Sequence, residues 1–304
     1  MKQRKSFTED GVQVGWDATS VDLAATCLRK YYYSMIRGIK PRQQSVHLIF
    51  GGIYASALET FYKLRAGGDD YETALRSVVR QALIDSWDTE RSAPVPFEDT
   101  KKTRPNLIRT LVWYLEEFGI EDPNGLVTYH LADGQPAVEL SFTFEIDDDI
   151  LYCGHLDRVS KMGDHLYVVD QKTTGGTVGQ YFFDRYSPDN QMSGYAYAGR
   201  VVLSAPISGV IIDAAQIAIN FSRFERQPVT RTKAQLEEWR KNALHFIKVA
   251  QSASYLQDFP MNTTACNNYG GCPFKPLCSK DPSVREAYIK SDYVEHVWDP
   301  LKAR

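Results

Sequence analysis

The chain has 304 residues, of which 43% are hydrophobic and 24% are charged, so it can form a substantial core and is not a disordered chain. Its formal net charge of -3 excludes a protein that is basic overall, and any nucleic-acid site must be a local basic surface. No apolar run is long enough for a membrane span and no signal-like segment opens the sequence. We therefore expect a cytoplasmic protein that makes no membrane contact.

The first third of the chain predicts helices. Apolar residues recur at helical spacing over residues 20–36, with Ser20 as the expected N-cap. Further helices are expected over residues 47–65, 71–87 and 106–118, separated by glycines and by a polar stretch.

The middle of the chain predicts strands. Residues 126–130, 137–146, 150–161 and 166–173 are rich in β-formers and predict an antiparallel meander. A helix over 190–202, a strand over 209–218 and a helix over 232–250 follow, the last opened by Thr232 and Gln235 as a capping box. We expect three parts: a helical region (1–125), a core (126–255) and a cysteine-rich tail (256–304).

Two acidic residues lie at the ends of neighbouring predicted strands. Asp157 is in the first strand and Asp170 in the second, and a Met-Gly-Asp turn at 162–164 joins them in a hairpin. Two such carboxylates repel each other unless a cation lies between them, and magnesium prefers oxygen ligands. Lys172 lies on the same face as Asp170 because strand side chains alternate. The pattern predicts a metal site with an adjacent ammonium.

Three segments in this order resemble the RecB-like branch of the PD-(D/E)XK nuclease superfamily. Residues 154–158 read Gly-His-Leu-Asp-Arg, residues 170–174 read Asp-Gln-Lys-Thr-Thr, and residues 191–195 read Gln-Met-Ser-Gly-Tyr. The resemblance implies that Asp157, Asp170 and the Gln171 carbonyl bind Mg²⁺ or Mn²⁺ and that Lys172 positions or activates the nucleophile. Gln191 and Tyr195 would hold the scissile phosphate or orient Lys172; the alternative for this pair is a surface turn.

The sequence departs from this family at one position. RecB-like nucleases commonly have a histidine in a Phe-Gly-x-x-x-His-x-x-Leu-Glu segment, whereas residues 50–59 here read Phe-Gly-Gly-Ile-Tyr-Ala-Ser-Ala-Leu-Glu. Ala55 therefore stands where a metal-binding imidazole is expected. Glu59 and Glu139 are candidates to compensate, although solvated or ion-paired roles are favoured for both. His155 and His165 are interpreted as structural residues.

Three of the five cysteines lie within the segment CNNYGGCPFKPLC. An odd number of cysteines argues against a disulfide framework and favours reduced thiols. One N-terminal and three C-terminal cysteines around the nuclease motifs resemble the 4Fe-4S nucleases of the AddB and CRISPR-adaptation type. This resemblance implies a cluster held by Cys27, Cys266, Cys272 and Cys278. Zinc is one alternative, since four thiolates suit both zinc and an iron-sulfur cluster. Plain buried thiols without a metal are another. Cys153 is interpreted as a core residue.

Basic and aromatic residues alternate near the N-terminus. Arg29, Lys30, Tyr31, Arg37 and Lys40 can pair phosphates with stacking surfaces for unpaired bases, which favours single-stranded DNA. The alternative is that the tyrosines pack in the core and the charges form a solvated helix face.

Together these features predict an α/β protein with a restriction-endonuclease-like core, in which helices flank a mixed sheet, and with an iron-sulfur lobe made from both ends of the chain. The resemblance implies a metal-dependent DNA exonuclease acting on single strands or DNA ends in recombination, repair or replication. Its compact form also resembles phage-encoded members, and no phosphate-binding loop of an ATP motor is present. The alternative is a catalytically silent DNA-binding or assembly subunit with a structural cluster. A homo-oligomer is compatible with either.

Overall fold

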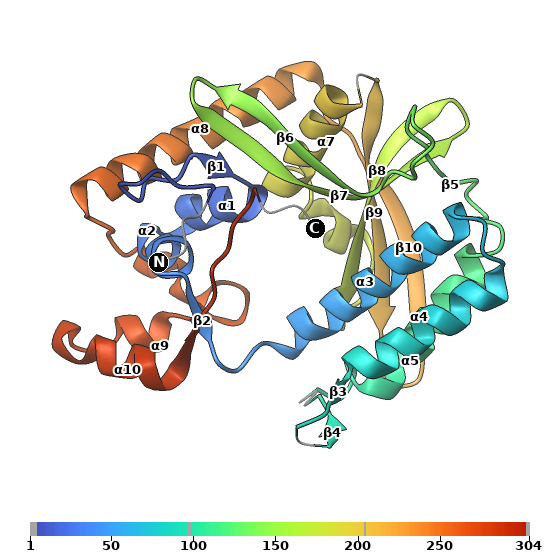
Figure 1. Cartoon of the computed structure of the whole chain (residues 1–304), viewed down its shortest axis with the longest axis horizontal. Coiled ribbons are helices and arrows are strands. Elements are labelled where there is room, and N and C mark those ends of the chain that lie inside the picture. The colour runs from blue at the N-terminus through green and yellow to red at the C-terminus, as the bar shows by residue number, and fades with distance from the viewer. Residues whose placement is uncertain (1–4, 91, 96–98, 204, 302–304) are drawn as a thin grey trace. The chain divides into compact units, whose positions relative to one another are not determined.

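A computed structural model describes residues 5–90, 92–95, 99–203 and 205–301 of the chain (Figure 1). Contacts group the residues into two units. Unit 1 consists of Met1–Gln44, Ser141–Gly154 and Lys233–Arg304, and unit 2 consists of Ser45–Leu140 and His155–Thr232. Strands β6 (Val138–Asp147) and β7 (Ile150–Met162) contribute residues to both. The three sequence-based ranges remain a prediction.

Unit 1 combines segments from both ends of the chain. Its other elements are β1 (Gly15–Trp16), α1 (Ala18–Thr26), α2 (Leu28–Tyr31), a π-helix (Tyr32–Ile36), β2 (Ile39–Pro41), α8 (Lys233–Leu256), 3₁₀-helices (Thr263–Gly270 and Pro282–Val284), α9 (Lys275–Cys278), α10 (Arg285–Asp292) and β11 (Tyr293–Glu295). Strands β2 and β11 pair antiparallel, Ile39 opposite Glu295. A backbone ladder thus joins residues that are 256 positions apart in sequence, Ile39 and Glu295.

The single helix expected over residues 20–36 is wrong in two respects. Asp17, not Ser20, is the N-cap: its carboxylate accepts from the Ser20 amide at 2.8 Å, and Ser20 Oγ accepts from the Asp17 amide at 3.0 Å. The helix then stops at Cys27, whose backbone is extended. Beyond it the Arg29 amide donates to the Pro260 carbonyl at 3.2 Å, so a tertiary hydrogen bond replaces a helical one.

Unit 2 contains a mixed sheet. Its elements are α3 (Val46–Ala66), α4 (Tyr71–Asp85), β3 (Trp87–Asp88), β4 (Ala93–Pro94), α5 (Arg104–Phe118), β5 (Val127–Thr128), β8 (His165–Thr174), α6 (Gln180–Asp184), α7 (Asn190–Val202), β9 (Ile207–Ile217) and β10 (Ser222–Val229). Strand β7 pairs antiparallel with β5 and β8, β8 pairs parallel with β9, and β9 pairs antiparallel with β10. The expected hairpin of β7 and β8 is confirmed.

Strand β10 was not predicted from sequence. Its residues read Ser-Arg-Phe-Glu-Arg-Gln-Pro-Val, with little apolar alternation, and most are half-buried. Within the described residues β10 ends the strand order after β9, a position at which a proline such as Pro228 is tolerated. One of its arginines, Arg226, forms buried ion pairs with Asp122 at 2.6 Å and Asp213 at 3.0 Å.

Helices cover both faces of the unit 2 sheet. Thr173 of β8 lies beside Gly51 of α3, whereas the preceding residue, Lys172, contacts Gln191 of α7. Because alternate strand residues point to opposite faces, α3 and α7 lie on opposite faces of β8. In Figure 1, α3 runs across the strands of this sheet. Its apolar side packs with α4 and α5 around fully buried residues that include Phe50, Leu58, Phe61, Leu107 and Leu111.

No helix in the described ranges combines the length and apolar composition that a bilayer crossing requires.

Candidate active site

The β7–β8 hairpin brings the two predicted acids together. The last paired residues of the ladder are Arg158 and Val169, so Asp157 and Asp170 lie immediately beyond it, one on each strand. Asp157 Oδ2 accepts a long hydrogen bond of 3.4 Å from the Gln171 amide. Asp170 is only 1% exposed. The sequence prediction that these acids lie close together therefore agrees with the geometry.

A chain of polar contacts connects Lys172 to helix α7. Lys172 Nζ lies 2.7 Å from Asp170 Oδ2 and donates to Gln191 Oε1 at 2.9 Å. Gln191 Nε2 in turn donates to the Tyr195 hydroxyl at 3.0 Å. The side chains of Gln191 and Tyr195 lie one helical turn apart and so share a face of α7. The ammonium is thereby held in one position beside Asp170.

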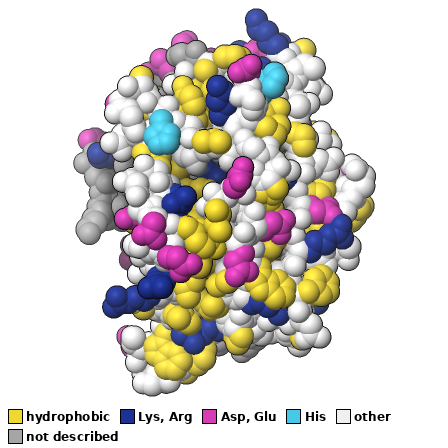
Figure 2. Space-filling view, turned by 90° about the vertical axis from the view of Figure 1, so that its right-hand side faces the viewer, with side chains coloured by type: hydrophobic (Ala, Val, Ile, Leu, Met, Phe, Trp, Pro, Cys, Tyr) yellow, Lys and Arg dark blue, Asp and Glu magenta, His cyan; other side chains and the backbone are white. Residues whose placement is uncertain are grey.

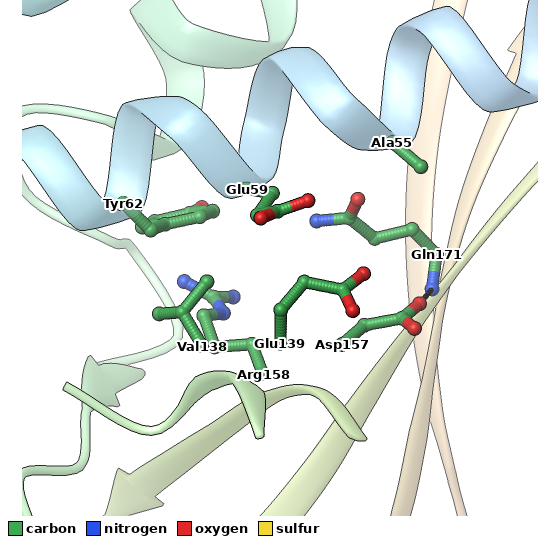
Figure 3. A pocket seen from close by; sticks show the side chains of 8 residues that line it. All are labelled: Ala55, Glu59, Tyr62, Val138, Glu139, Asp157, Arg158 and Gln171. Carbon is green, nitrogen blue, oxygen red and sulfur yellow. Dashed lines mark hydrogen bonds between the residues drawn. The ribbon is translucent and has the colours of Figure 1, made fainter. Parts of the chain in front are cut away.

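A small cavity lies between helix α3 and the strands. Its volume is about 10 Å³, which is near the space that one water needs. Figure 3 shows the carboxylates of Glu139 and Asp157 on the strand side of this space and Ala55 and Glu59 of α3 on the opposite side, with the Gln171 side chain reaching between them toward Glu59. The cavity is therefore lined with oxygen atoms of the type that hard divalent cations bind.

Glu139 lines this cavity and has an unusual backbone conformation. Its φ is +50°, in the left-handed region that disfavours side chains with a Cβ. Its side chain is 14% exposed, and Oε2 lies 3.9 Å from His155 Nδ1. Glu59 instead pairs with Lys63 at 2.5 Å along α3 and is 28% exposed. The residue pattern did not distinguish Glu139 from Glu59 as a candidate metal ligand, because nothing in the pattern reveals a positive φ.

A buried arginine forms the back of the cavity. Arg158 is 2% exposed, and its guanidinium lies 3.7 Å from the centre of the Tyr62 ring. Its Nε and Nη2 have no hydrogen-bond partner among the described atoms. Its positive charge offsets part of the negative charge of the cavity carboxylates. The family motif includes this arginine, but the motif alone does not indicate that it is buried against Tyr62.

The titration of the site reflects crowded acids. Burial, followed by the charge of Asp170, raises the pKa of Asp157 to about 7, although Lys172 opposes this. Burial also raises the pKa of Asp170, again opposed by Lys172. For Lys172 burial alone would lower the pKa, but Asp170 and Asp157 outweigh it and the net direction is upward. Lys172 therefore stays protonated, and a further cation would relieve the repulsion between the acids.

The donor atoms suit Mg²⁺ or Mn²⁺ in kind, but they do not form a closed coordination shell. Within the described residues, no group of three or more His, Cys, Asp or Glu side chains is arranged to hold a metal ion. Asp170 Oδ2 is buried, and its nearest cation is the Lys172 ammonium. The carboxylates of Asp157 and Glu139, which line the water-sized cavity, are of the kind that a hard cation binds.

The four cysteines of the predicted cluster all lie in unit 1 as free thiols. The Asn262 amide donates to Cys27 Sγ at 3.3 Å, and the Cys272 amide donates to the Cys266 carbonyl at 2.9 Å. Burial raises the pKa of Cys278, and the neighbouring thiols Cys272 and Cys27 raise it further. The donor set fits a thiolate-bound metal, while the positions of the sulfurs do not enclose one. Cys153 is buried and belongs to the core, as expected.

The predicted DNA-binding residues of the N-terminal region are largely used in folding. Tyr31 is fully buried, stacks on Trp16 with ring centres 5.6 Å apart and donates to Gln13 at 2.9 Å, so its proposed role in base stacking is wrong. Arg29 Nε donates to the Phe259 carbonyl at 2.7 Å, and Arg37 forms two hydrogen bonds to Glu286. Lys30 and Lys40 are half-buried.

Basic residues are also not concentrated on the face drawn in Figure 2. On that face acidic and basic side chains are interspersed with apolar ones. This mixed pattern agrees with the small net charge of the chain.

A mixed sheet flanked by helices, with two acids and a lysine at the end of a hairpin, defines a nuclease-like core. The sequence profile of the PD-(D/E)XK nuclease superfamily matches residues 16–279, and the chain belongs to this superfamily. A comparison with curated proteins gave no match. Among solved structures, a candidate exonuclease from Eubacterium rectale is similar, with a TM-score of 0.48 and 12% identity over 82% of this chain and 84% of that one.

Proposed function

We propose that the protein is a metal-dependent deoxyribonuclease that acts on single-stranded DNA or DNA ends. The observation that carries this proposal is the convergence of Asp157, Asp170 and Lys172 at one end of the β7–β8 hairpin. The superfamily supports hydrolysis of phosphodiester bonds. Exonuclease action and a role in recombination, repair or replication are further parts of the proposal, drawn from the RecB-like motifs.

Four oxygen donors are the candidates to hold the metal ion, although the side chains of the described residues do not enclose one as they stand. These are the carboxylates of Asp157 and Asp170, the Gln171 carbonyl, and the carboxylate of Glu139, which lies with Asp157 in the cavity beside Ala55. Glu139 thus takes the place of the histidine that the family has at position 55. When bound, Mg²⁺ or Mn²⁺ supplies a Lewis acid and lowers the pKa of bound water.

Lys172 acts as a fixed positive charge rather than as a base. Its pKa is raised by the two acids, so it carries a proton at neutral pH. Gln191 holds the ammonium, and Tyr195 holds Gln191. A preorganised cation at this position stabilises the negative charge that develops on the phosphate in the transition state. Gln191 and Tyr195 are therefore positioning residues.

The alternative is a DNA-binding or assembly subunit without catalysis. Ala55 favours it, since an alanine removes one metal ligand of the family. Glu139 favours the enzyme, since its strained backbone directs a carboxylate into the same cavity.

An activity assay distinguishes the two. Purified protein is incubated with Mn²⁺ and end-labelled single strands, beside Lys172→Met. Metal-dependent shortening that the variant loses supports the enzyme. If wild type retains DNA but does not cut it, the subunit is correct, and Ala55→His then tests whether the missing imidazole is the reason.

We also infer that Cys27, Cys266, Cys272 and Cys278 bind an iron-sulfur cluster in unit 1. The chemistry of four free thiols supports it, and such a cluster would cross-link the two chain ends of the unit. Anaerobically purified protein should be brown, with absorbance at roughly 400 nm and bound iron. A colourless protein that contains zinc would establish the alternative metal, and Cys27→Ser should lower the metal content in either case.

A further inference from the structure

A second hollow lies on the α3 side of the sheet in unit 2, beyond the end of β8. Its volume is about 480 Å³. The start of α3, the segment before α5 and the end of β8 line it. The lining residues are His47, Asp99, Thr100, Lys101, Lys102, Thr173, Thr174, Gly175 and Gly176. Two lysines, several hydroxyl groups and two glycines are combined here with a single acid. This composition suits the binding of an anion, because the surroundings are polar and the two glycines have no side chains to block its approach.

We propose that this hollow is a subsite for the backbone phosphates of the DNA strand, next to the metal cavity. The proposal rests on the nuclease function above and adds where the strand runs. It makes Lys101 and Lys102 the substrate-binding cations of unit 2, in place of the N-terminal residues that are used in folding.

The lysines are held by the sheet end itself. Lys101 Nζ donates to the Gly175 carbonyl at 2.6 Å, and Lys102 Nζ donates to Thr173 Oγ1 at 3.2 Å. Lys102 is 3% exposed and lies over the Phe50 ring at 5.4 Å. Burial lowers the pKa of Lys102 to about 8, opposed by Asp99, so an approaching phosphate would favour its charged form. Lys101 is the more accessible of the two and is the candidate for direct contact.

The hollow and the metal cavity follow the same side of α3. His47 lies at one end and Ala55 at the other, with Gly51 between them at intervals of four residues, which places all three on one helix face. Eight residues of helix span about 12 Å. Phosphates on a strand are at least about 3.4 Å apart along the axis, so the hollow lies within about four nucleotides of the cavity. Gly51, which lies between them, carries no side chain, and a Cβ there would lie 3.5 Å from Oγ1 of Thr173, a residue that lines the hollow.

The test measures binding of single-stranded oligothymidylates by fluorescence anisotropy, with Ca²⁺ in place of Mn²⁺ to prevent cutting. Lys101→Gln is compared with Lys161→Gln, which removes the same charge at the opposite end of β8, where Lys161 is paired with Leu166. For a twelve-nucleotide strand we expect Lys101→Gln to weaken binding three- to tenfold and to reduce the salt slope by about 0.7, the value for one phosphate contact on a single strand. Lys161→Gln should change neither.

Two further measurements make the result specific. A dinucleotide reaches the cavity but not the hollow, so its affinity should be the same for wild type and Lys101→Gln. Lys102→Met, which keeps the buried stem, should weaken binding of the long strand without lowering the unfolding temperature by more than a few degrees. Equal affinity and salt slope for wild type and Lys101→Gln would overturn the subsite and leave the nuclease proposal intact. A wild-type protein that neither binds nor cuts DNA would refute the nuclease proposal itself.

Discussion

Replacing Asp157 by asparagine is expected to stabilise the metal-free protein while abolishing its response to metal. Asp157 lies near the carboxylates of Asp170 and Glu139. Burial, followed by the charge of Asp170, raises its pKa to about 7. A folded chain with a raised carboxyl pKa loses stability as the pH rises, because ionisation costs more in the folded than in the unfolded state. Asparagine removes that cost and keeps an oxygen for the Gln171 amide.

The magnitude follows from the two pKa values. Between the ordinary value of 3.8 and the value of about 7 in the folded chain, stability falls with rising pH, and above pH 7 the loss is complete. The full cost at pH 8 is on the order of 4 kcal/mol, and less than half of it is present at pH 5. That cost already includes the opposing attraction of Lys172. Because the asparagine amide group must find hydrogen-bond partners at a half-buried position, we expect a smaller net gain of about 2 kcal/mol at pH 8, or roughly 4 °C in the unfolding temperature.

The assay is thermal unfolding of wild type and Asp157→Asn at pH 5 and pH 8, in EDTA and with millimolar Mn²⁺. Asp164→Asn, in the exposed turn of the same hairpin, is the matched control and should behave as wild type. In EDTA the variant should unfold at a higher temperature than wild type, and by more at pH 8. With Mn²⁺ wild type should gain stability and the variant should not. A variant that is less stable than wild type in EDTA at pH 8 would refute the argument that the acids repel each other.

Four other substitutions test the site and the fold. Lys172→Met should reduce cleavage on the order of 10²–10³-fold in single-turnover assays while DNA is still bound, and near-normal cleavage would remove Lys172 from the mechanism. Glu139→Gln should weaken Mn²⁺ binding about tenfold in calorimetry, a loss of about 1.4 kcal/mol. Glu59→Gln should weaken it less, and the reverse order would make Glu59 the ligand. Arg226→Met leaves Asp213 buried without its cation and should lower the free energy of unfolding by about 3–5 kcal/mol in denaturant titration, whereas an unchanged midpoint would show that the pair is dispensable.

The hairpin and its chemical residues were predictable because local pattern determines them. Asp157, Asp170 and Lys172 lie at positions set by strand alternation and by one tight turn, so their meeting required no knowledge of distant segments. The contacts of Gln191 and Tyr195 also follow the family motif that the sequence displays.

The features that the sequence did not predict depend on long-range contacts and on backbone conformation. The break at Cys27 depends on segment 260–262, which is more than two hundred residues away and invisible to a helical periodicity. Tyr31 looked like a stacking surface because burial cannot be read from an alternation of tyrosines and basic residues. Glu139 gains its position from a backbone conformation, and strand β10 gains its place from pairing with β9 rather than from its own composition.

The left-handed backbone of Glu139 implies that this residue lowers the stability of the fold while it contributes to metal binding. A glycine there would adopt φ +50° without steric conflict and would take one acid out of a crowded cavity, so Glu139→Gly should give a hardier protein. That protein would bind the divalent cation more weakly. The backbone conformation of Glu139 therefore exchanges stability for a carboxylate in the candidate metal site.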